Sequence, residues 1–337
     1  MVDMGKSAVV AGAGGFIGHH LVKFLKAEGY WVRGVDVKLP AYEQTCADEF
    51  EQVDLRVWAH CLLATTEVNE VYQLAADMGG MGYISVHRAD IARNNVLINA
   101  HMLEAARQNG VSRFFFSSSA CVYPMYRQDT PEVEGLREED AYPADPEEGY
   151  GLEKLYSEKL CQYFLDEGKL LTRVARFHNI YGPLGTYDGG REKAPAAICR
   201  KVALARDGDV IEVWGDGRQS RSFLYVDDCV EGIYRIMHSD YPKPLNLGSD
   251  EGVAIDELVD LVARIAGKTL GKRHRLDAPQ GVRGRNSDNS RLGGVLGWLP
   301  RTSLRDGLAP TYSWIEAQLR QQGRVPATAE LEGAGAW

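Results

Sequence analysis

Short apolar runs alternate with longer amphipathic stretches through the first half of the chain. The apolar runs predict strands, and they fall at residues 7–11, 30–35, 70–74, 113–117 and 171–176. The stretches between them predict helices at residues 21–28, 90–109 and 150–167. Strands that alternate with helices in this way favour a parallel sheet with crossover helices. The predicted fold class is therefore α/β, with a doubly wound parallel sheet.

The pattern changes after residue 178. Glycine, proline and basic residues dominate 181–195, and Trp214-Gly215-Asp216-Gly217 indicates a hairpin-type turn. Further helices are predicted at 195–205, 227–238, 255–266 and 303–322. We expect a larger domain over 1–178, to which 222–250 returns, and a smaller α/β substrate-binding domain over 179–221 and 251–325. The small-residue-rich tail, 326–337, is expected to be mobile.

Composition and charge narrow the class of protein. The 337 residues include 47 acidic and 38 basic side chains, a formal charge of -9, so we expect no nucleic-acid partner because such binding needs a basic face. No apolar run approaches the ~20 residues that cross a bilayer, and the N-terminus lacks a signal-peptide core. The six cysteines show no zinc-site spacing. We expect a reduced, soluble, cytoplasmic protein with no metal, which still allows an anionic small molecule where basic residues converge.

A glycine-rich loop joins the first predicted strand to the first helix. Gly12, Gly15 and Gly18 allow a tight turn and the close approach of a pyrophosphate. Phe16 and Ile17 belong to the same loop, which leads to the helix N-terminus, where free N–H groups favour negative charge. In this strand–turn–helix context the loop predicts a dinucleotide site.

Two carboxylates are candidates for the adenosine part of the dinucleotide. Asp36 ends the second strand, where it would accept hydrogen bonds from a ribose diol and repel a 2′-phosphate. This favours NAD over NADP, although Arg33 and Lys38 lie nearby. Asp54 is either an adenine contact or an ordinary loop-capping residue.

A phenol and an ammonium group lie one helical turn apart, at Tyr150 and Lys154. An unperturbed tyrosine has a pKa of about 10, so a nearby cation is needed to stabilise the phenolate. The pair predicts a tyrosine that takes the proton of a sugar hydroxyl while NAD takes the hydride.

These motifs and several further strings resemble the extended short-chain dehydrogenase/reductase family of nucleotide-sugar epimerases and dehydratases. The strings span 12–18, 117–123, 150–154, 176–183, 221–228 and 246–249. Four others, 75–82, 119–121, 189–197 and 281–289, are similar to the branch that epimerises GDP-mannose at C3 and C5. The resemblance implies a Rossmann sheet and NAD-assisted conversion of GDP-mannose to GDP-L-galactose, with GDP-L-gulose as a side product.

The same resemblance implies roles for individual residues. Cys121 and Lys193 would be the acid/base pair, with either one as the base, and Ser119 would orient the C4 oxygen beside Tyr150. Dehydratases carry Asp-Glu where Ala120-Cys121 stand, so dehydration is not expected. The implied substrate contacts are Met78, Gly79, Ser119, Ala120, Cys121, Asn179, Glu192, Lys193, Ala194, Lys201, Gln219, Arg221 and Arg285.

Two alternatives remain open at this point. A GDP-4-keto-6-deoxymannose 3,5-epimerase/4-reductase also uses a cysteine, but it prefers NADPH, which Asp36 disfavours, and its second acid/base group is a histidine. A non-catalytic NAD-sensing protein on the same fold would be expected to lack Tyr150 or Lys154. His178 is expected to be structural. The partners expected are a GDP-sugar and a second copy of the chain, which would pair through the long helices before and after Cys121.

Overall fold

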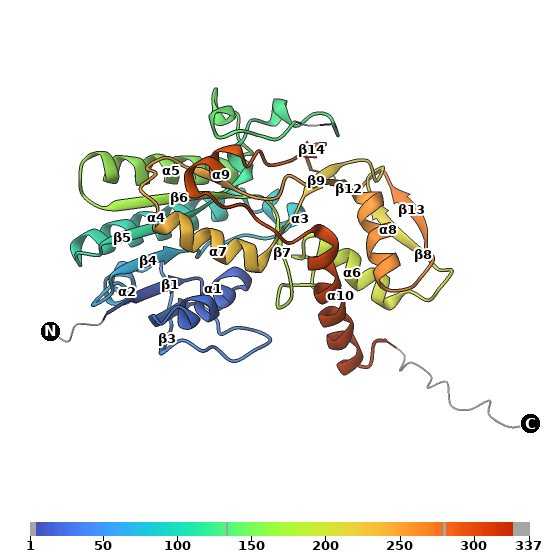
Figure 1. Cartoon of the computed structure of the whole chain (residues 1–337), viewed down its shortest axis with the longest axis horizontal. Helices are drawn as coiled ribbons and strands as arrows, with labels where there is room; N and C mark the ends of the chain where they lie inside the picture. The colour runs from blue at the N-terminus through green and yellow to red at the C-terminus, as the bar shows by residue number, and fades with distance from the viewer. Residues whose placement is uncertain (1–4, 133, 279–280, 326–337) are drawn as a thin grey trace, which may run out of the picture.

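The computed structural model describes residues 5–132, 134–278 and 281–325, and its largest element is a seven-stranded parallel sheet (Figure 1). The strand order is β11-β6-β5-β4-β1-β2-β3, and each neighbouring pair is parallel. The strands are β1 (Ser7–Ala11), β2 (Trp31–Asp36), β3 (Glu49–Gln52), β4 (Glu70–Gln73), β5 (Arg113–Ser119), β6 (Leu171–Phe177) and β11 (Leu245–Leu247). The order reverses direction between β1 and β4, which is where doubly wound sheets bind ligands.

Helices cover both faces of this sheet because its strands are apolar on both sides. Along β1, Ala8 and Val10 belong to one core cluster, and Val9 and Ala11 to another, as the alternation of side chains requires. The first cluster takes in α1 (Phe16–Ala27) and α7 (Val226–Met237). The second takes in α2 (Trp58–Ala64), α4 (Arg88–Gln108) and α5 (Tyr150–Asp166).

A smaller lobe lies beyond the carboxyl ends of the strands (Figure 1). Its core packs three helices, α6 (Ala194–Leu204), α8 (Ile255–Ile265) and α10 (Leu304–Gln321). Its strands are short: β8 (Val210–Trp214) pairs with β13 (Gly271–Arg275), and β9 (Ser220–Ser222) lies between β12 (Gly252–Ala254) and β14 (Gly284–Arg285). A two-stranded pair, β7 (Ile180–Tyr181) and β10 (Leu224–Tyr225), links the lobes.

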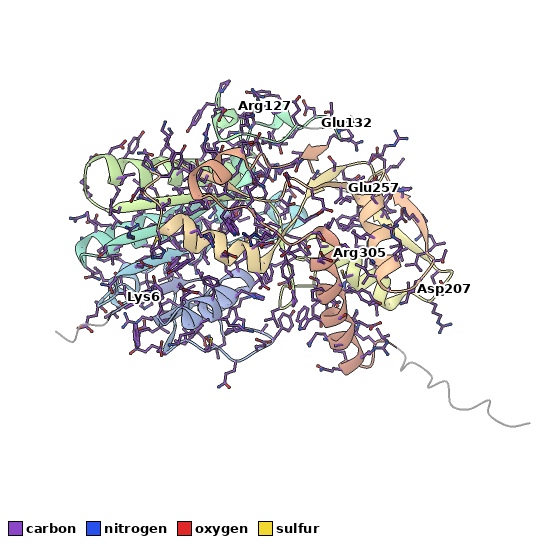
Figure 2. The ribbon with its side chains drawn as sticks, in the orientation of Figure 1. Lys6, Arg127, Glu132, Asp207, Glu257 and Arg305 are labelled. Carbon is purple, nitrogen blue, oxygen red and sulfur yellow. The ribbon has the colours of Figure 1, made fainter. Side chains whose placement is uncertain are left out.

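Short helices complete the fold. They are α3 (Met81–Ile84), α9 (Ser290–Leu296), and the 3-10 turns η1 (Ala120–Val122), η2 (Met125–Arg127) and η3 (Glu138–Ala141). Charged side chains such as Lys6, Asp207 and Glu257 lie on the outer surface of the two lobes (Figure 2). No helix among the described residues is long and apolar enough to cross a membrane.

The predicted fold class is confirmed, and the predicted strands and helices are present with ends shifted by a few residues. The hairpin at 214–217 is wrong. The chain does turn there, with Gly215 and Gly217 at positive φ, but β8 pairs with β13 while β9 pairs with β12 and β14. The turn passes the chain from one sheet to another.

The domain boundaries stay a prediction, and two observations bear on them. β11 pairs with β6, so part of 222–250 lies in the large sheet. Leu292 and Trp298 also pack in the core cluster of α1 and α7, although the predicted boundary assigns them to the smaller domain. The tail at 326–337, expected to be mobile, lies outside the described residues.

Candidate active site

The glycine loop forms a tight turn between β1 and α1. Gly12 has a φ of +88°, and a Cβ on it would lie 2.9 Å from the backbone nitrogen of Ala75. A Cβ on Gly18 would lie 2.1 Å from the carbonyl oxygen of Gly12. Gly15 caps α1 without a side-chain hydrogen bond, and the first turn of the helix carries no acidic residue. The N–H groups at this end of the helix are therefore suited to an anion.

Asp36 lies at the carboxyl end of β2, beside the glycine loop. Its carboxylate accepts hydrogen bonds from the backbone N–H of Gly14 at 3.0 Å and from that of Lys38 at 3.2 Å. Burial raises the pKa of this carboxyl group, and the two N–H groups and the Lys38 charge oppose the shift. The two N–H groups fix the carboxylate next to the dinucleotide loop.

Tyr150 and Lys154 lie in the first turns of α5, with Ser119 opposite them at the end of β5. Both Tyr150 and Lys154 are buried, and the Lys154 ammonium lies 5.6 Å from the centre of the Tyr150 ring. Burial raises the pKa of Tyr150 well above its usual value, while a hydrogen bond with Ser119 lowers it. Burial lowers the pKa of Lys154, which donates to the carbonyl oxygen of Ser117 at 2.9 Å.

Cys121 lies in η1, which follows β5 directly, and its side chain is 9% exposed. The Ser119 hydroxyl accepts a hydrogen bond from the Cys121 backbone N–H at 3.1 Å, which holds the turn. The Arg285 guanidinium donates to the thiol sulfur, with Nη1 3.3 Å from Sγ. Burial raises the pKa of the Cys121 thiol, and the Arg285 charge opposes that shift. The thiol packs in one cluster with Tyr150 and Met78.

Lys193 approaches the same thiol from the other lobe, where it is the N-cap residue of α6. Burial lowers the pKa of its ammonium group, and the charge of Cys121 raises it. Among the described residues its Nζ makes no hydrogen bond or ion pair, so the group is available to a ligand. Arg221 is a third cation near Cys121, and burial together with the Arg285 charge lowers its pKa to about 9.

A loop after β4 covers this centre. Gly79 packs under Tyr83, so that a Cβ on it would lie 2.9 Å from the Tyr83 Cβ. The Tyr83 hydroxyl donates to Asp77 at 3.1 Å, and the Arg191 guanidinium lies 3.9 Å from the centre of the Tyr83 ring. The loop that carries Met78 is thus connected to the loop that carries Lys193.

Comparison with known proteins identifies the family of this chain. The profile of the "NAD dependent epimerase/dehydratase family" matches residues 8–248. The chain belongs to this family. It is 48% identical to GDP-mannose 3,5-epimerase 1 of Oryza sativa subsp. japonica over 315 residues, which cover 93% of this chain and 82% of that protein. It is 46% identical to GDP-mannose 3,5-epimerase of Arabidopsis thaliana (96% and 86% covered), and 28% identical to GDP-L-fucose synthase of Escherichia coli K12 (93% and 98% covered).

Solved structures of nucleotide-sugar enzymes share the fold. UDP-glucose 4-epimerase of Thermotoga maritima, with UDP-glucose, superposes with a TM-score of 0.83 at 25% identity, covering 93% of this chain and 99% of that one. MoeE5 in complex with UDP-glucuronic acid and NAD gives a TM-score of 0.78 at 30% identity, covering 94% and 100%.

The cofactor of this epimerase/dehydratase family is NAD, and the residues present fit it. The α1 N-terminus offers N–H groups to a pyrophosphate and Asp36 offers a carboxylate to a ribose diol. Arg33 is buried, and its guanidinium donates to Glu49 and to the carbonyl oxygens of Ala64 and Thr66. Arg33 is therefore not available to a 2′-phosphate.

The other predicted site residues divide into two groups. Ala120 and Ala194 lie next to Cys121 and Lys193, and the Asn179 amide donates to the Ser222 carbonyl oxygen at 3.0 Å. Gln219 is 6% exposed and donates to the Trp214 carbonyl oxygen, while its own amide oxygen has no partner in the described part of the chain. These residues stay candidates for substrate contact.

Several predicted residues are occupied by partners of their own. Asp54 pairs with Arg56 at 2.6 Å. Glu192 is held by Arg200 at 2.9 Å. Lys201 donates to the carbonyl oxygen of Glu212 at 2.7 Å. Of the basic residues among the predicted substrate contacts, Lys193, Arg221 and Arg285 are the ones whose charges interact with Cys121, although Arg221 also donates to the carbonyl oxygens of Ser220 and Val282.

Sequence reasoning missed two polar residues at this centre. Glu147 contacts the Cys121 thiol, and its charge raises the pKa of that thiol. Gln128 accepts a hydrogen bond from the Nε of Arg285 at 2.6 Å. Nothing in the sequence distinguishes Glu147 from its neighbour Glu148, which pairs with Arg88. His178 is fully buried, and burial lowers its pKa to about 3, as a structural role requires.

Proposed function

We propose that this chain is a GDP-mannose 3,5-epimerase, which converts GDP-alpha-D-mannose to GDP-beta-L-galactose and GDP-L-gulose. The observation that carries the proposal is the meeting at one site of the Cys121 thiol, the buried Tyr150 and the Lys193 ammonium group, which has no partner among the described residues. It is supported by relatives of that name at 46–48% identity.

The first step needs a group that removes the proton of the C4 hydroxyl. Ser119 and Tyr150 share a hydrogen bond, so together they can hold that hydroxyl. The charge of Lys154 favours the phenolate of Tyr150 as it takes the proton. NAD, when bound, accepts the C4 hydride and returns it at the end of the cycle.

The second step inverts carbons that carry no acidic proton until C4 is a ketone. Once it is, the hydrogens on C3 and C5 lie α to a carbonyl group, and a base on one ring face with an acid on the other can invert each carbon through an enolate. Cys121 and Lys193 fill these roles in our proposal. They come from different lobes, and the charge of Cys121 raises the pKa of Lys193. Groups that reach one site from two lobes can lie on opposite faces of a sugar.

The nucleotide diphosphate would lie on the basic side of this centre. Arg221 and Arg285 carry planar guanidinium groups suited to phosphate oxygens. The amide oxygen of Gln219, which has no partner in the part of the chain that the structure describes, would accept a hydrogen bond from a donor of the nucleotide. Met78 and Gly79 would contact the sugar, since their loop packs against Cys121 and Tyr150.

The epimerase/reductase alternative is less well supported. The GDP-L-fucose synthase relatives are 28% identical to this chain, against 46–48% for the epimerases. Arg33 faces away from a 2′-phosphate, and His178 is buried against Asn246, 3.0 Å away, so it does not reach the sugar site. Tyr150 and Lys154 lie together in a buried pair, which also disfavours a non-catalytic role.

A homodimer and a cytoplasmic location are part of the proposal. Leu152, Tyr156 and Tyr163 are more than half exposed on α5, and Leu97 is exposed on α4, which leaves an apolar stripe on the helices expected to pair. All six cysteines are free, which fits a reducing compartment. Light scattering of the purified chain should give twice the 37.3 kDa of one copy, and Tyr156→Glu should give a monomer.

Incubation with GDP-mannose tests the proposed function directly. The purified chain, without added cofactor, should convert GDP-mannose into two products that proton NMR identifies as the 5-epimer and the 3,5-epimer. UDP-glucose should remain unchanged in a parallel sample. Unchanged GDP-mannose, with NAD supplied in excess, would refute the proposal.

A further inference from the structure

Gln128 is buried behind the proposed acid/base thiol and makes contacts that fix its orientation. Its side chain is 0% exposed. The amide nitrogen donates to the carbonyl oxygens of Tyr123 at 3.2 Å and Pro124 at 3.1 Å. An amide whose nitrogen faces two carbonyl oxygens must present its own oxygen on the other side.

That oxygen holds Arg285. The Nε of Arg285 donates to the Gln128 Oε1 at 2.6 Å, and Nη1 of the same guanidinium lies 3.3 Å from the Cys121 sulfur. Because a guanidinium group is planar and rigid, fixing Nε also fixes the direction of Nη1. The backbone of Gln128 also holds the segment that carries Arg285, since the Gln128 carbonyl oxygen accepts hydrogen bonds from the N–H groups of Arg283 and Gly284.

We infer that Gln128 is a positioning residue for the epimerisation: it holds the Arg285 guanidinium against the Cys121 thiol and so favours the thiolate. This inference rests on the proposed function in so far as Cys121 is an acid/base group. Holding Arg285 in place matters because some charged groups near the thiol favour the thiolate and others oppose it. The groups that face it are Arg285, Arg221, Lys193, Lys154, Tyr150 and Glu147.

The electrostatic balance explains why the position of Arg285 matters. Burial and Glu147 disfavour the thiolate, while Arg285 makes the largest contribution that favours it. A charge acts in inverse proportion to distance, and its effect on a buried group is large. A guanidinium that Gln128 no longer held would not be kept in its direction toward the sulfur.

The test reads the thiol itself, without substrate. Iodoacetamide alkylates thiolates, and peptide mass spectrometry reports each cysteine separately across a pH series. In Gln128→Leu the alkylation rate of Cys121 near neutral pH should fall about tenfold, the equivalent of one pKa unit. Cys46 is exposed and lies outside the site, so its rate in the same sample should not change and serves as the internal control.

A double-mutant cycle distinguishes positioning from general damage. Arg285→Gln alone should slow Cys121 alkylation by a similar factor, and adding Gln128→Leu to it should have no further effect. An unchanged pH profile in Gln128→Leu, or a second tenfold loss in the double variant, would overturn the inference. If Gln128→Leu does not fold, judged by NAD binding, Gln128→Met serves in its place. Because no sugar is present, this outcome is independent of whether GDP-mannose is the substrate.

Discussion

The two halves of the site are built from contacts of very different range along the chain. On the dinucleotide side, Gly12 to Gly18 form one loop, and Tyr150 and Lys154 lie in consecutive turns of one helix. On the proton-transfer side, Arg285 reaches Cys121 across 164 positions and Gln128 across 157. The first half is assembled as its own elements form, whereas the second exists only when the smaller lobe has docked.

This difference has a mechanistic consequence. The dinucleotide half rests on long parallel strands that are buried on both faces. The proton-transfer half depends on strands of two or three residues, β9, β12 and β14. We therefore expect substitutions in the second half to abolish inversion and leave cofactor binding intact, which separates the two functions experimentally.

The largest effect is expected from Tyr150→Phe, because removal of the hydroxyl blocks the oxidation on which both halves depend. The turnover of GDP-mannose should fall by about three orders of magnitude, within the range of acid–base catalysis. NAD should remain bound, as measured in the denatured supernatant of the purified protein. Tyr156→Phe, at an exposed position on the same helix, is the matched control and should retain full activity. Loss of NAD from the first variant would contradict the division between the halves.

Lys193→Ala and Cys121→Ala should break the second half alone. Oxidation at C4 should still proceed, so reduced cofactor should accumulate on the protein after GDP-mannose is added, while epimer formation falls by at least about a hundredfold. The absorbance and fluorescence of NADH report the first quantity, and NMR the second. Cys46→Ala, which changes an exposed cysteine, should behave like the unmodified chain. Normal epimerisation by either active-site variant would show that the acid/base assignment is wrong.

A smaller effect is expected from Asp36→Asn, which removes the charge that would favour a ribose diol. NAD affinity, measured by calorimetry after the cofactor is stripped, should fall about tenfold, since a hydrogen bond to a charged group contributes ~1.5–3 kcal/mol. The ratio of the affinity for NAD to the affinity for NADP should also decrease. Asp54→Asn should matter less, because Arg56 already neutralises that carboxylate. Equal losses of NAD affinity in the two variants would indicate that both carboxylates contact the adenosine part of the dinucleotide.

The smallest effect concerns a network at the amino ends of β2 and β4, outside both halves. The Nε2 of His238 lies 3.0 Å from the Glu70 carboxylate and 3.1 Å from the Tyr30 hydroxyl, and it is hydrogen-bonded to both. The hydrogen bond with Glu70 raises the His238 pKa above its usual 6.5. A raised folded-state pKa stabilises the fold below about pH 6.5, and this contribution is lost as pH rises through the folded-state value. Because His238 is partly exposed, we expect less than ~1 kcal/mol.

Thermal unfolding across a pH series measures this contribution. The chain should lose slightly more stability between pH 6 and pH 8 than His238→Gln does, with turnover unchanged in the variant. Identical pH slopes for the two proteins would show that the pair with Glu70 contributes nothing.

Much of this molecule could be predicted from its sequence because the relevant signals are local. The buried strands, the glycine loop and the Tyr150–Lys154 spacing each lie within one short window, and the structure places them together. Asp36 follows from the same logic, since it ends the strand that succeeds the loop. A parallel sheet brings such strand ends to one edge.

The remaining features of the fold and the site depend on tertiary contacts between residues that lie far apart in the sequence. The glycines at 215 and 217 predict a turn, but the partner of β8 lies 61 residues further on, from Val210 to Gly271. Lys201 and Glu192 match the expected residue types, yet each is held by a neighbour that the sequence does not reveal. Gln128 carries no signal of its own, because an amide becomes a positioning residue only through what it touches.

The most direct test of the account is the exchange of sugar hydrogens with solvent. We predict that the purified chain, incubated with GDP-mannose in deuterated water, places deuterium at C5 and C3 and none at C4, because the C4 hydrogen leaves and returns as a hydride. Deuterium at C4, or products without deuterium at C5 and C3, would contradict the division between a hydride-transfer half and a proton-transfer half.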